Sequence, residues 1–186
     1  MEPKPLATTN AVVSSNATHQ TDLQQQKIAG AIGIITGSPL YVDASPIPVY
    51  HSNGEVLTTL TQFGGDNILA LKCLHQTATH YAVWLEDQQL GYLPKNSDQI
   101  QLQTWEQHIL TVFAVSFNST DNPIRSRPDV RAEKSPTPTQ EVYYYMPHRI
   151  MGSWLQLKYG PENDRHYGWI QWKSGETLLI DLHYFA

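Results

Sequence analysis

Eight histidines are spread along the sequence, and clustered histidines are a common source of metal ligands. His75 and His80 lack the His-Glu-x-x-His pattern that places two zinc ligands on one helix face. His148, His166 and His183 lie in three separate segments, so only the fold could bring them together. We therefore expect no metal site and no cofactor, and a metal-dependent hydrolase is the weakest of the functional hypotheses.

The sequence also lacks a recognisable set of residues for nucleophilic or acid–base catalysis. The single cysteine, Cys73, lies in the apolar run 68–74, where a free cysteine usually packs as a small apolar side chain. The sequence has no Gly-x-Ser-x-Gly elbow. Glu162 and Asp164 are neighbours in one polar turn, whereas a glycosidase holds its two carboxyl groups across a cleft. These observations predict a protein that is not an enzyme.

Aromatic side chains remain, and the stretch from Trp154 to Asp181 indicates how they are placed. It holds two alternating runs on either side of a polar turn with a glycine and a proline, the pattern of an antiparallel meander. The alternation puts Leu155 and Leu157 on one face and Trp154 on the other, and in the returning run Trp169 also faces away from the aliphatic side chains. Bare aromatic surface is costly in water, so such rings are covered by another segment or contact a ligand.

Short β-prone runs recur through the rest of the chain and indicate an all-β protein. Prolines in the region 39–50 favour an irregular loop or an edge strand there. The other strands expected in the first half are 31–36, 56–60, 68–74, 81–85 and 90–93. Those expected in the second half are 109–117, 141–146 and 178–185, together with the meander.

Two pairs of motifs carry a resemblance to a known family. Trp-Leu-Gln-Leu at 154–157 and Tyr-Gly-Trp-Ile at 167–170 resemble the closing strands of bacterial SH3-like domains, which commonly read Trp-Tyr-x-Val and, after a hairpin, Gly-Trp/Tyr-Val/Ile. The first half repeats the pattern at 80–85 and at 91–94. The stretch 123–128 is similar to the family's Asn-Val-Arg-x-x-Pro, whereas Pro-Val-Tyr at 48–50 departs from it.

This resemblance implies two small SH3-like barrels in tandem. The first barrel would span residues 31–97 and the second residues 98–186, with the short boundary at 94–98 holding them at a nearly fixed angle. Residues 1–30 form a lead rich in Thr, Asn, Gln and Ser, which we expect to be mostly disordered because it offers too little apolar area to bury.

The resemblance also implies where a ligand would bind, since SH3-like folds bind extended peptides in a groove of aromatic side chains. Two arginines could add carboxylate recognition, for example of a peptidoglycan stem peptide. The alternative is that the rings pack against the first barrel, the lead or the loop 129–140. The expected ligand-binding residues are Tyr143, Tyr145, Arg149, Trp154, Arg165 and Trp169.

Charge and hydropathy exclude other classes of partner. The net charge is −5 and the 12 Lys and Arg are scattered, whereas nucleic-acid binding requires a basic stripe. No apolar run approaches the ~18–20 residues that cross a bilayer, so we expect no membrane-spanning segment. Met1 is followed by Glu2 and Pro3 rather than by an apolar signal, but the polar lead resembles the tether of an envelope protein. We expect the periplasm or cell envelope, with an export signal outside this sequence; the alternative is the cytoplasm.

Together these features predict a non-enzymatic binding or adaptor module of the bacterial cell envelope. Its ligand would be peptidoglycan or a peptide or protein partner. The alternative is a small inhibitor or immunity protein that blocks a cell-wall hydrolase by inserting the loop 161–166.

Overall fold

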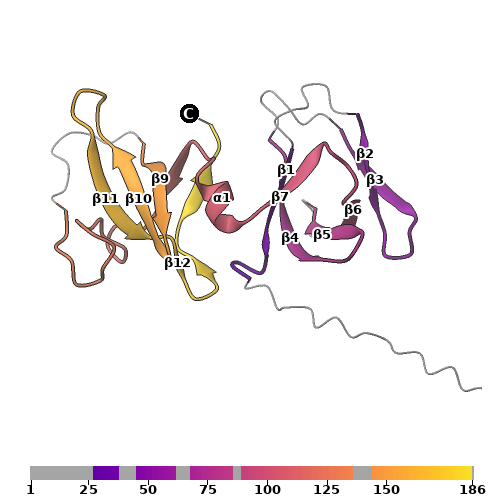
Figure 1. Ribbon diagram of the computed structural model, residues 1–186, viewed down its shortest axis with the longest axis horizontal. Coiled ribbons are helices and arrows are strands. Elements are labelled where there is room, and N and C mark those ends of the chain that lie inside the picture. Colours follow the sequence, from indigo (N-terminus) through magenta and orange to yellow (C-terminus); the bar gives the residue numbers. More distant parts are fainter. Residues whose placement is uncertain (1–26, 38–44, 62–67, 86–88, 136–143, 186) are drawn as a thin grey trace, which may run out of the picture.

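The computed structural model describes residues 27–37, 45–61, 68–85, 89–135 and 144–185 (Figure 1). Residues 1–26 of the expected disordered lead, residues 39–44 of the region 39–50 and the candidate Tyr143 lie outside these residues. The end of that lead, residues 27–30, is not disordered: Ile28 is 3% exposed and packs in the core, and Ala29 N donates to Glu176 O at 2.7 Å. Within them the chain is mostly β, as predicted, and one short helix is present. The sheets are antiparallel and open rather than closed barrels, with β3 and β7 at the edges of the largest one.

The first half forms one seven-stranded sheet with the order β3-β2-β6-β5-β4-β1-β7. Burial alternates along β2 and β6, so that one face of the sheet holds the aliphatic core and the other carries His80 and Tyr92. The strands are β1 (Gly33–Gly37), β2 (Ile47–Tyr50), β3 (Val56–Leu60), β4 (Ala70–Gln76), β5 (His80–Trp84), β6 (Leu90–Pro94) and β7 (Ile100–Gln103).

Cys73 belongs to the apolar core of this sheet, as predicted. Its side chain is fully buried between aliphatic residues such as Ile35, Val49 and Val83. Burial raises the pKa of the Cys73 thiol to about 11, which keeps it protonated at neutral pH. The residue is therefore a core side chain, with the reactivity of a thiol rather than a thiolate.

The prediction of a strand over residues 109–117 is wrong for its first part. A helix, α1 (Trp105–Ile109), begins at Thr104, whose hydroxyl accepts a hydrogen bond from Gln107 N at 3.2 Å. The Gln107 side chain in turn accepts a hydrogen bond from Thr104 N at 2.9 Å, which completes a capping box. A turn follows the helix, in which Thr111 N donates to His108 O at 2.9 Å, so residues 110–113 are not extended and the strand β8 is only Ala114–Ser116.

The second half contains a three-stranded meander with the order β11-β10-β9. β8 pairs with the last strand, β14, so the C-terminal segment is tied into a sheet as predicted. A small hairpin, β12 with β13, precedes β14. The strands are β9 (Met146–Met151), β10 (Trp154–Tyr159), β11 (His166–Gln171), β12 (Lys173–Ser174), β13 (Thr177–Leu178) and β14 (Asp181–His183).

Strand pairing in the second half follows the order of the first. Single bridges join Val115 of β8 to Tyr145 and place Arg125 beside Trp169 of β11. The resulting order, from the Arg125 segment through β11, β10, β9 and β8 to β14, parallels the order β2-β6-β5-β4-β1-β7. In this correspondence Arg125 beside Trp169 matches Tyr50 beside Tyr92.

In each half a glycine lets the neighbouring segment pass close to the strand, and it does so at the same place; we call this place the crossing. A Cβ on Gly91 would lie 2.5 Å from Val49 Cγ1, and a Cβ on Gly168 would collide with Ile124 Cγ2. Val49 and Ile124 each directly precede the residue that pairs with the neighbouring strand. The Gly-Tyr and Gly-Trp motifs therefore serve the same packing need in both halves.

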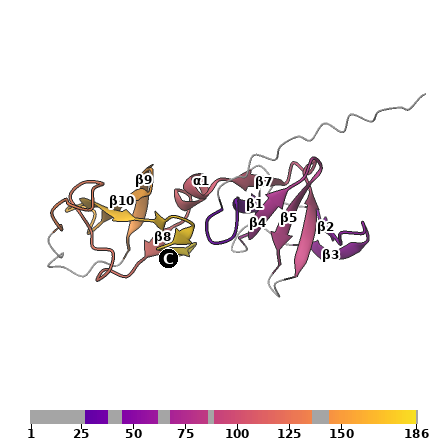
Figure 2. The same cartoon turned by 90° about the horizontal axis from the view of Figure 1, so that it is seen from below.

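The two halves share a core around α1, which lies between them (Figure 2). Ile28, Ala31 and Ile34 pack into the cluster that also holds Trp105 and Trp172. Trp105 Nε1 donates to Ala31 O at 3.0 Å. The beginning of the first half is therefore part of the core of the second.

A buried histidine also links the halves. His108 is 1% exposed, its Nδ1 lies 2.9 Å from Gln103 Oε1, and its Nε2 lies 2.8 Å from Tyr184 Oη. Because a carboxamide oxygen only accepts, the neutral ring donates from Nδ1 and accepts at Nε2 from the tyrosine. Burial lowers the pKa of His108 from 6.5 to about 4.

Candidate functional site

The outward side chains of β9, β10 and β11 form a surface that we call the cationic face. Burial alternates along β10, with Leu155, Leu157 and Tyr159 in the core. The intervening side chains therefore point away from the core, as the sequence predicted for Trp154. The cationic face comprises His148, Arg149, Met151, Trp154, Gln156, Lys158, Tyr167, Trp169 and Gln171.

Arg149 and Trp169 form the centre of this face. Both residues pair with Gln156, one on each side, so the three side chains lie in one row across the sheet. The Arg149 guanidinium lies 4.9 Å from the centre of the Trp169 ring. Trp169 is only 4% exposed, while Arg149 is exposed. The indole is thus a support that holds a solvent-facing guanidinium by a cation–π contact.

A second row lies beside the first. Lys158 pairs with Tyr167, whose side chain is 48% exposed. The His148 and Tyr167 rings approach with their centres 5.0 Å apart. Arg125, placed beside Trp169, extends the surface past β11. Aromatic area and positive charge are therefore interleaved over the width of the meander.

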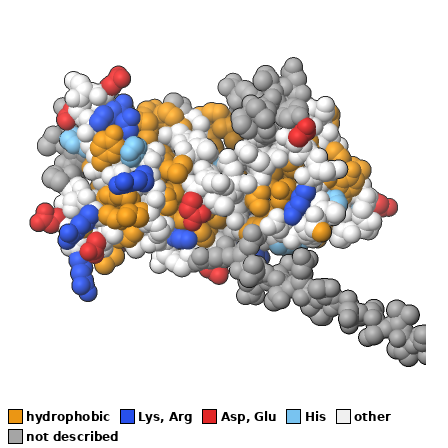
Figure 3. Space-filling view, in the orientation of Figure 1, with side chains coloured by type: hydrophobic (Ala, Val, Ile, Leu, Met, Phe, Trp, Pro, Cys, Tyr) orange, Lys and Arg blue, Asp and Glu red, His pale blue; other side chains and the backbone are white. Residues whose placement is uncertain are grey.

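No carboxylate lies on the three strands themselves, since β9, β10 and β11 contain neither Asp nor Glu. The acidic residues Glu162 and Asp164 are in the turn beyond, where Asp164 Oδ2 lies 3.3 Å from His166 Nε2. Figure 3 shows Lys, Arg and His side chains gathered among hydrophobic ones over the half that holds β9–β11. In a chain with a net charge of −5, this concentration of cations is local.

The predicted ligand-binding residues divide into two groups. Arg149, Trp154 and Trp169 come together on the cationic face. Tyr145 lies on the core side, where its ring is 5.1 Å from that of Phe117. Arg165 is in the β10–β11 turn, where Nη1 donates to Gly160 O at 3.0 Å.

Sequence reasoning missed the other side chains of this surface. His148, Lys158 and Tyr167 complete it, and Met151 adds 53% exposed apolar area. The strand was expected at 141–146, of which 141–143 lie outside the described residues, whereas β9 runs from Met146 to Met151; Pro147 and two basic residues interrupt the apolar pattern there. The alternation of the neighbouring meander was the one signal that could have placed Lys158 beside Tyr167.

The composition of the cationic face is that of a binding surface. Among the described residues no group of three or more His, Cys, Asp or Glu side chains is placed to hold a metal ion. The one helix of these residues, α1, is too short to cross a membrane. What the cationic face offers is a planar guanidinium, an ammonium group and exposed rings, a combination that pairs with carboxylates and packs on flat surfaces.

Comparison of the chain with protein-family models, with curated proteins and with solved structures found no match. The likeness to bacterial SH3-like domains therefore depends on the motifs of the sequence.

Proposed function

We propose that this protein is a non-enzymatic binding module of the bacterial cell envelope that recognises the carboxylate-bearing stem peptide of peptidoglycan. The observation that carries the proposal is the Arg149 guanidinium, exposed and held 4.9 Å over the Trp169 ring on strands without a carboxylate. A guanidinium fixed in this way loses little conformational freedom when it forms two parallel bonds to a carboxylate.

The composition of the face supports a peptide rather than a nucleic acid. Its cations are few and alternate with rings and with Gln156, which can donate to and accept from peptide groups. A nucleic-acid surface would present a longer basic stripe to the phosphates. Lys158 and Arg149 lie in adjacent rows, so they could contact two carboxylates of one short peptide.

We also propose that each half is an open form of the SH3-like unit. Two features support this assignment: the repeated Gly-Tyr and Gly-Trp motifs, and the matching crossings of Val49 over Gly91 and Ile124 over Gly168. In each half the crossing segment is the one that the resemblance aligns with the family's Asn-Val-Arg stretch.

Retention on purified peptidoglycan sacculi tests the proposed function. Arg149→Ala and Tyr167→Ala should each release most of the protein into the supernatant while leaving the thermal melt nearly unchanged, since both side chains are exposed. Lys72→Ala is the matched control, because it also removes one positive charge from an exposed strand position, but in the first half. Equal retention of all three variants would disprove the proposal.

One observation favours the inhibitor as a second candidate. The turn after β10 projects four consecutive exposed residues, 161–164, and is braced from within. Arg165 donates to Gly160 O, and Asp164 N donates to Pro161 O at 3.0 Å. A braced, exposed loop can enter an active site at low entropic cost. Inhibition of a purified cell-wall hydrolase in a sacculus-clearing assay, abolished by Glu162→Ala with Asp164→Ala, would identify this function.

A further inference from the structure

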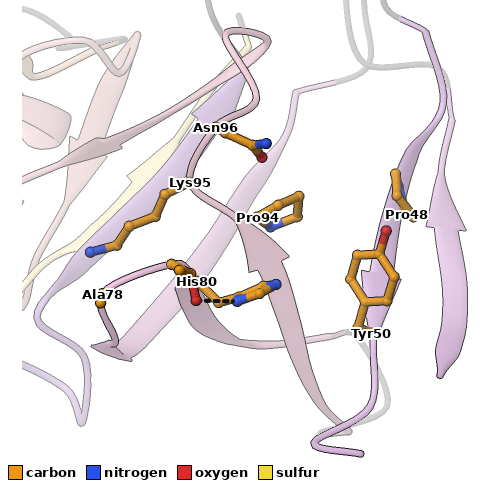
Figure 4. Close-up of a pocket in the computed structure, with 8 residues that line it drawn as sticks. Pro48, Tyr50, Ala78, His80, Pro94, Lys95 and Asn96 are labelled. Atoms are coloured by element: carbon orange, nitrogen blue, oxygen red, sulfur yellow. Dashed lines mark hydrogen bonds between the residues drawn. The ribbon is translucent and has the colours of Figure 1, made fainter. Parts of the chain in front are cut away.

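A pocket of about 720 Å³ lies on the outer face of the first half (Figure 4). This volume is within the range of about 300–1,000 Å³ that is typical of small-molecule sites. It is lined by Pro48 and Tyr50 of β2, His80 of β5, Pro94 of β6, and the adjoining residues Ala78, Thr79, Lys95 and Asn96. None of these residues belongs to the cationic face.

The pocket exists because two prolines lie opposite each other. β2 and β6 pair at Tyr50 and Tyr92, and continuing this antiparallel register by two residues puts Pro48 opposite Pro94 on the same face of the sheet. Neither proline has an N–H group, so the ladder stops and the strands separate beyond the tyrosines. The opening is therefore built into the sequence of both strands.

The floor of the pocket is held rigidly by the β4–β5 turn. Thr77 Oγ1 accepts from His80 N at 3.0 Å and donates to His80 O at 3.2 Å. Lys95 N donates to Thr79 O at 2.8 Å, which ties the turn to the end of β6. Thr79 Oγ1 lies 2.9 Å from His80 Nδ1 and fixes the imidazole ring. The site is thus formed before any ligand enters.

The groups directed into the pocket are an imidazole, a carboxamide, a phenol ring and two prolines, and none of the residues that line it carries a carboxylate. Figure 4 shows the free nitrogen of the His80 ring turned toward Tyr50, with the Asn96 amide also on the pocket side. The Tyr50 and His80 rings stand at 82° with their centres 6.1 Å apart, so they form a corner. Lys95 turns away: its Nζ donates to Gln76 Oε1 at 2.8 Å and lies 5.1 Å from the Tyr81 ring centre.

We propose that this pocket is a second binding site, for an uncharged sugar ring. A sugar ring has an apolar C–H face and a polar edge, which match the two walls of the corner. Its apolar face would pack on Tyr50, with Pro48 and Pro94 beside it, and its hydroxyl groups would bond to His80 Nε2 and the Asn96 amide. This inference does not depend on the function proposed for the cationic face.

An extended peptide fits the same walls less well. Strand addition requires free main-chain donors, and the prolines at the opening supply none. A proline-rich helix binds in a groove between parallel aromatic ridges. Here the two rings stand at 82°, which favours a compact ring over an extended chain.

The experiment is a titration of the isotope-labelled protein with chitotetraose and with cellotetraose, followed by NMR. We expect saturable shifts at Tyr50, His80 and Asn96 with at least one of the two saccharides. His80→Trp should weaken binding about tenfold or more, because it removes the Nε2 group that bonds to a sugar hydroxyl. The strand position accepts a Trp in the second half, where Trp154 pairs with Gln171 as His80 pairs with Pro94. Asn96→Ala, at an exposed position, should weaken binding without affecting the fold.

Arg149→Ala is the control and should bind the saccharide unchanged. It separates the two proposals, because it removes the central cation of the other site. The inference is overturned if neither saccharide causes saturable shifts, or if His80→Trp and Asn96→Ala bind as tightly as the unmodified protein. It is also overturned if a decaproline peptide, and no saccharide, shifts the pocket residues.

Discussion

Two strands pair in the same way in each half, at Tyr50 with Tyr92 in the first half and at Arg125 with Trp169 in the second. The surfaces beside these two pairs differ: a pocket lies beside the first and the cationic face beside the second. In the second half Asn122 closes the ladder, since its Nδ2 donates to Gln171 O at 2.7 Å and its Oδ1 accepts from Gln171 N at 3.0 Å. In the first half two prolines leave the ladder open. One strand arrangement thus supports a flat charged surface or a pocket.

The same difference changes the role of the aromatic residue at the crossing. Trp169 is buried beneath Arg149 and contributes to stability, whereas Tyr92 is half-buried and pairs with Tyr50, a residue that lines the pocket. Hydrogen bonds and side-chain size at a few positions therefore decide whether a face is closed and charged or open to a pocket.

The largest difference between the two halves is expected when Trp169 and Tyr92 are each replaced by Ala. Trp169→Ala should lower the free energy of unfolding by about 3–5 kcal/mol, the usual cost of removing a buried large ring. Tyr92→Ala should cost clearly less, since its side chain is only half-buried. Urea denaturation of both variants checks this. If both variants lost the same free energy of unfolding, the distinction between the buried Trp169 ring and the half-buried Tyr92 ring would be contradicted.

Acid should weaken the contact that holds the two halves together. The pKa of His108 is about 4 in the folded protein and ordinarily 6.5, so the unfolded chain binds more protons between these values. The free energy of unfolding should fall by about 3 kcal/mol as the pH decreases from 6.5 to 4. Urea denaturation at a series of pH values measures this fall.

His108→Asn is the control for that experiment. An amide cannot titrate in this range, so this variant should lose that part of the pH dependence while being less stable at pH 7. A fall of the same size in both proteins would assign the acid sensitivity to other groups.

Removing the Asn122 side chain that bonds to the Gln171 backbone should have the smallest effect on stability. Asn122→Ala removes two hydrogen bonds to Gln171 and should cost about 1–2 kcal/mol. It should also speed the hydrogen exchange of the Gln171 amide. Asn96→Ala, whose amide has no hydrogen-bond partner among the described residues, should change stability by less than about 0.5 kcal/mol. If the Gln171 amide exchanged at its original rate, Asn122 would not be what closes this crossing.

Part of this structure was predictable from the sequence. Alternation along 154–159 and 167–170 placed Leu155 and Leu157 in the core and Trp154 on the opposite face, because a strand has a period of two. The same rule put Trp169 on the outer face, but it could not show that Arg149 covers the ring. Coverage depends on a third strand whose side chains are distant in sequence.

Other features depend on contacts that no local pattern contains. The five-residue helix α1 has one local signal, the capping box of Thr104 and Gln107, but it also depends on the burial of Trp105 against the first half, a contact between residues distant in sequence. The pocket depends on the register of β2 and β6, which alone reveals that Pro48 and Pro94 lie opposite each other. Both prolines were visible in the sequence, but their opposition was not.

The most direct test of the proposed function is an NMR titration of the full chain with a soluble peptidoglycan stem peptide that carries free carboxylates. The account predicts saturable shifts at Arg149, Lys158 and Tyr167, abolished by Arg149→Ala, while the pocket residues Tyr50 and His80 do not respond. Shifts confined to the first half, or no saturable shift at the cationic face, would contradict it.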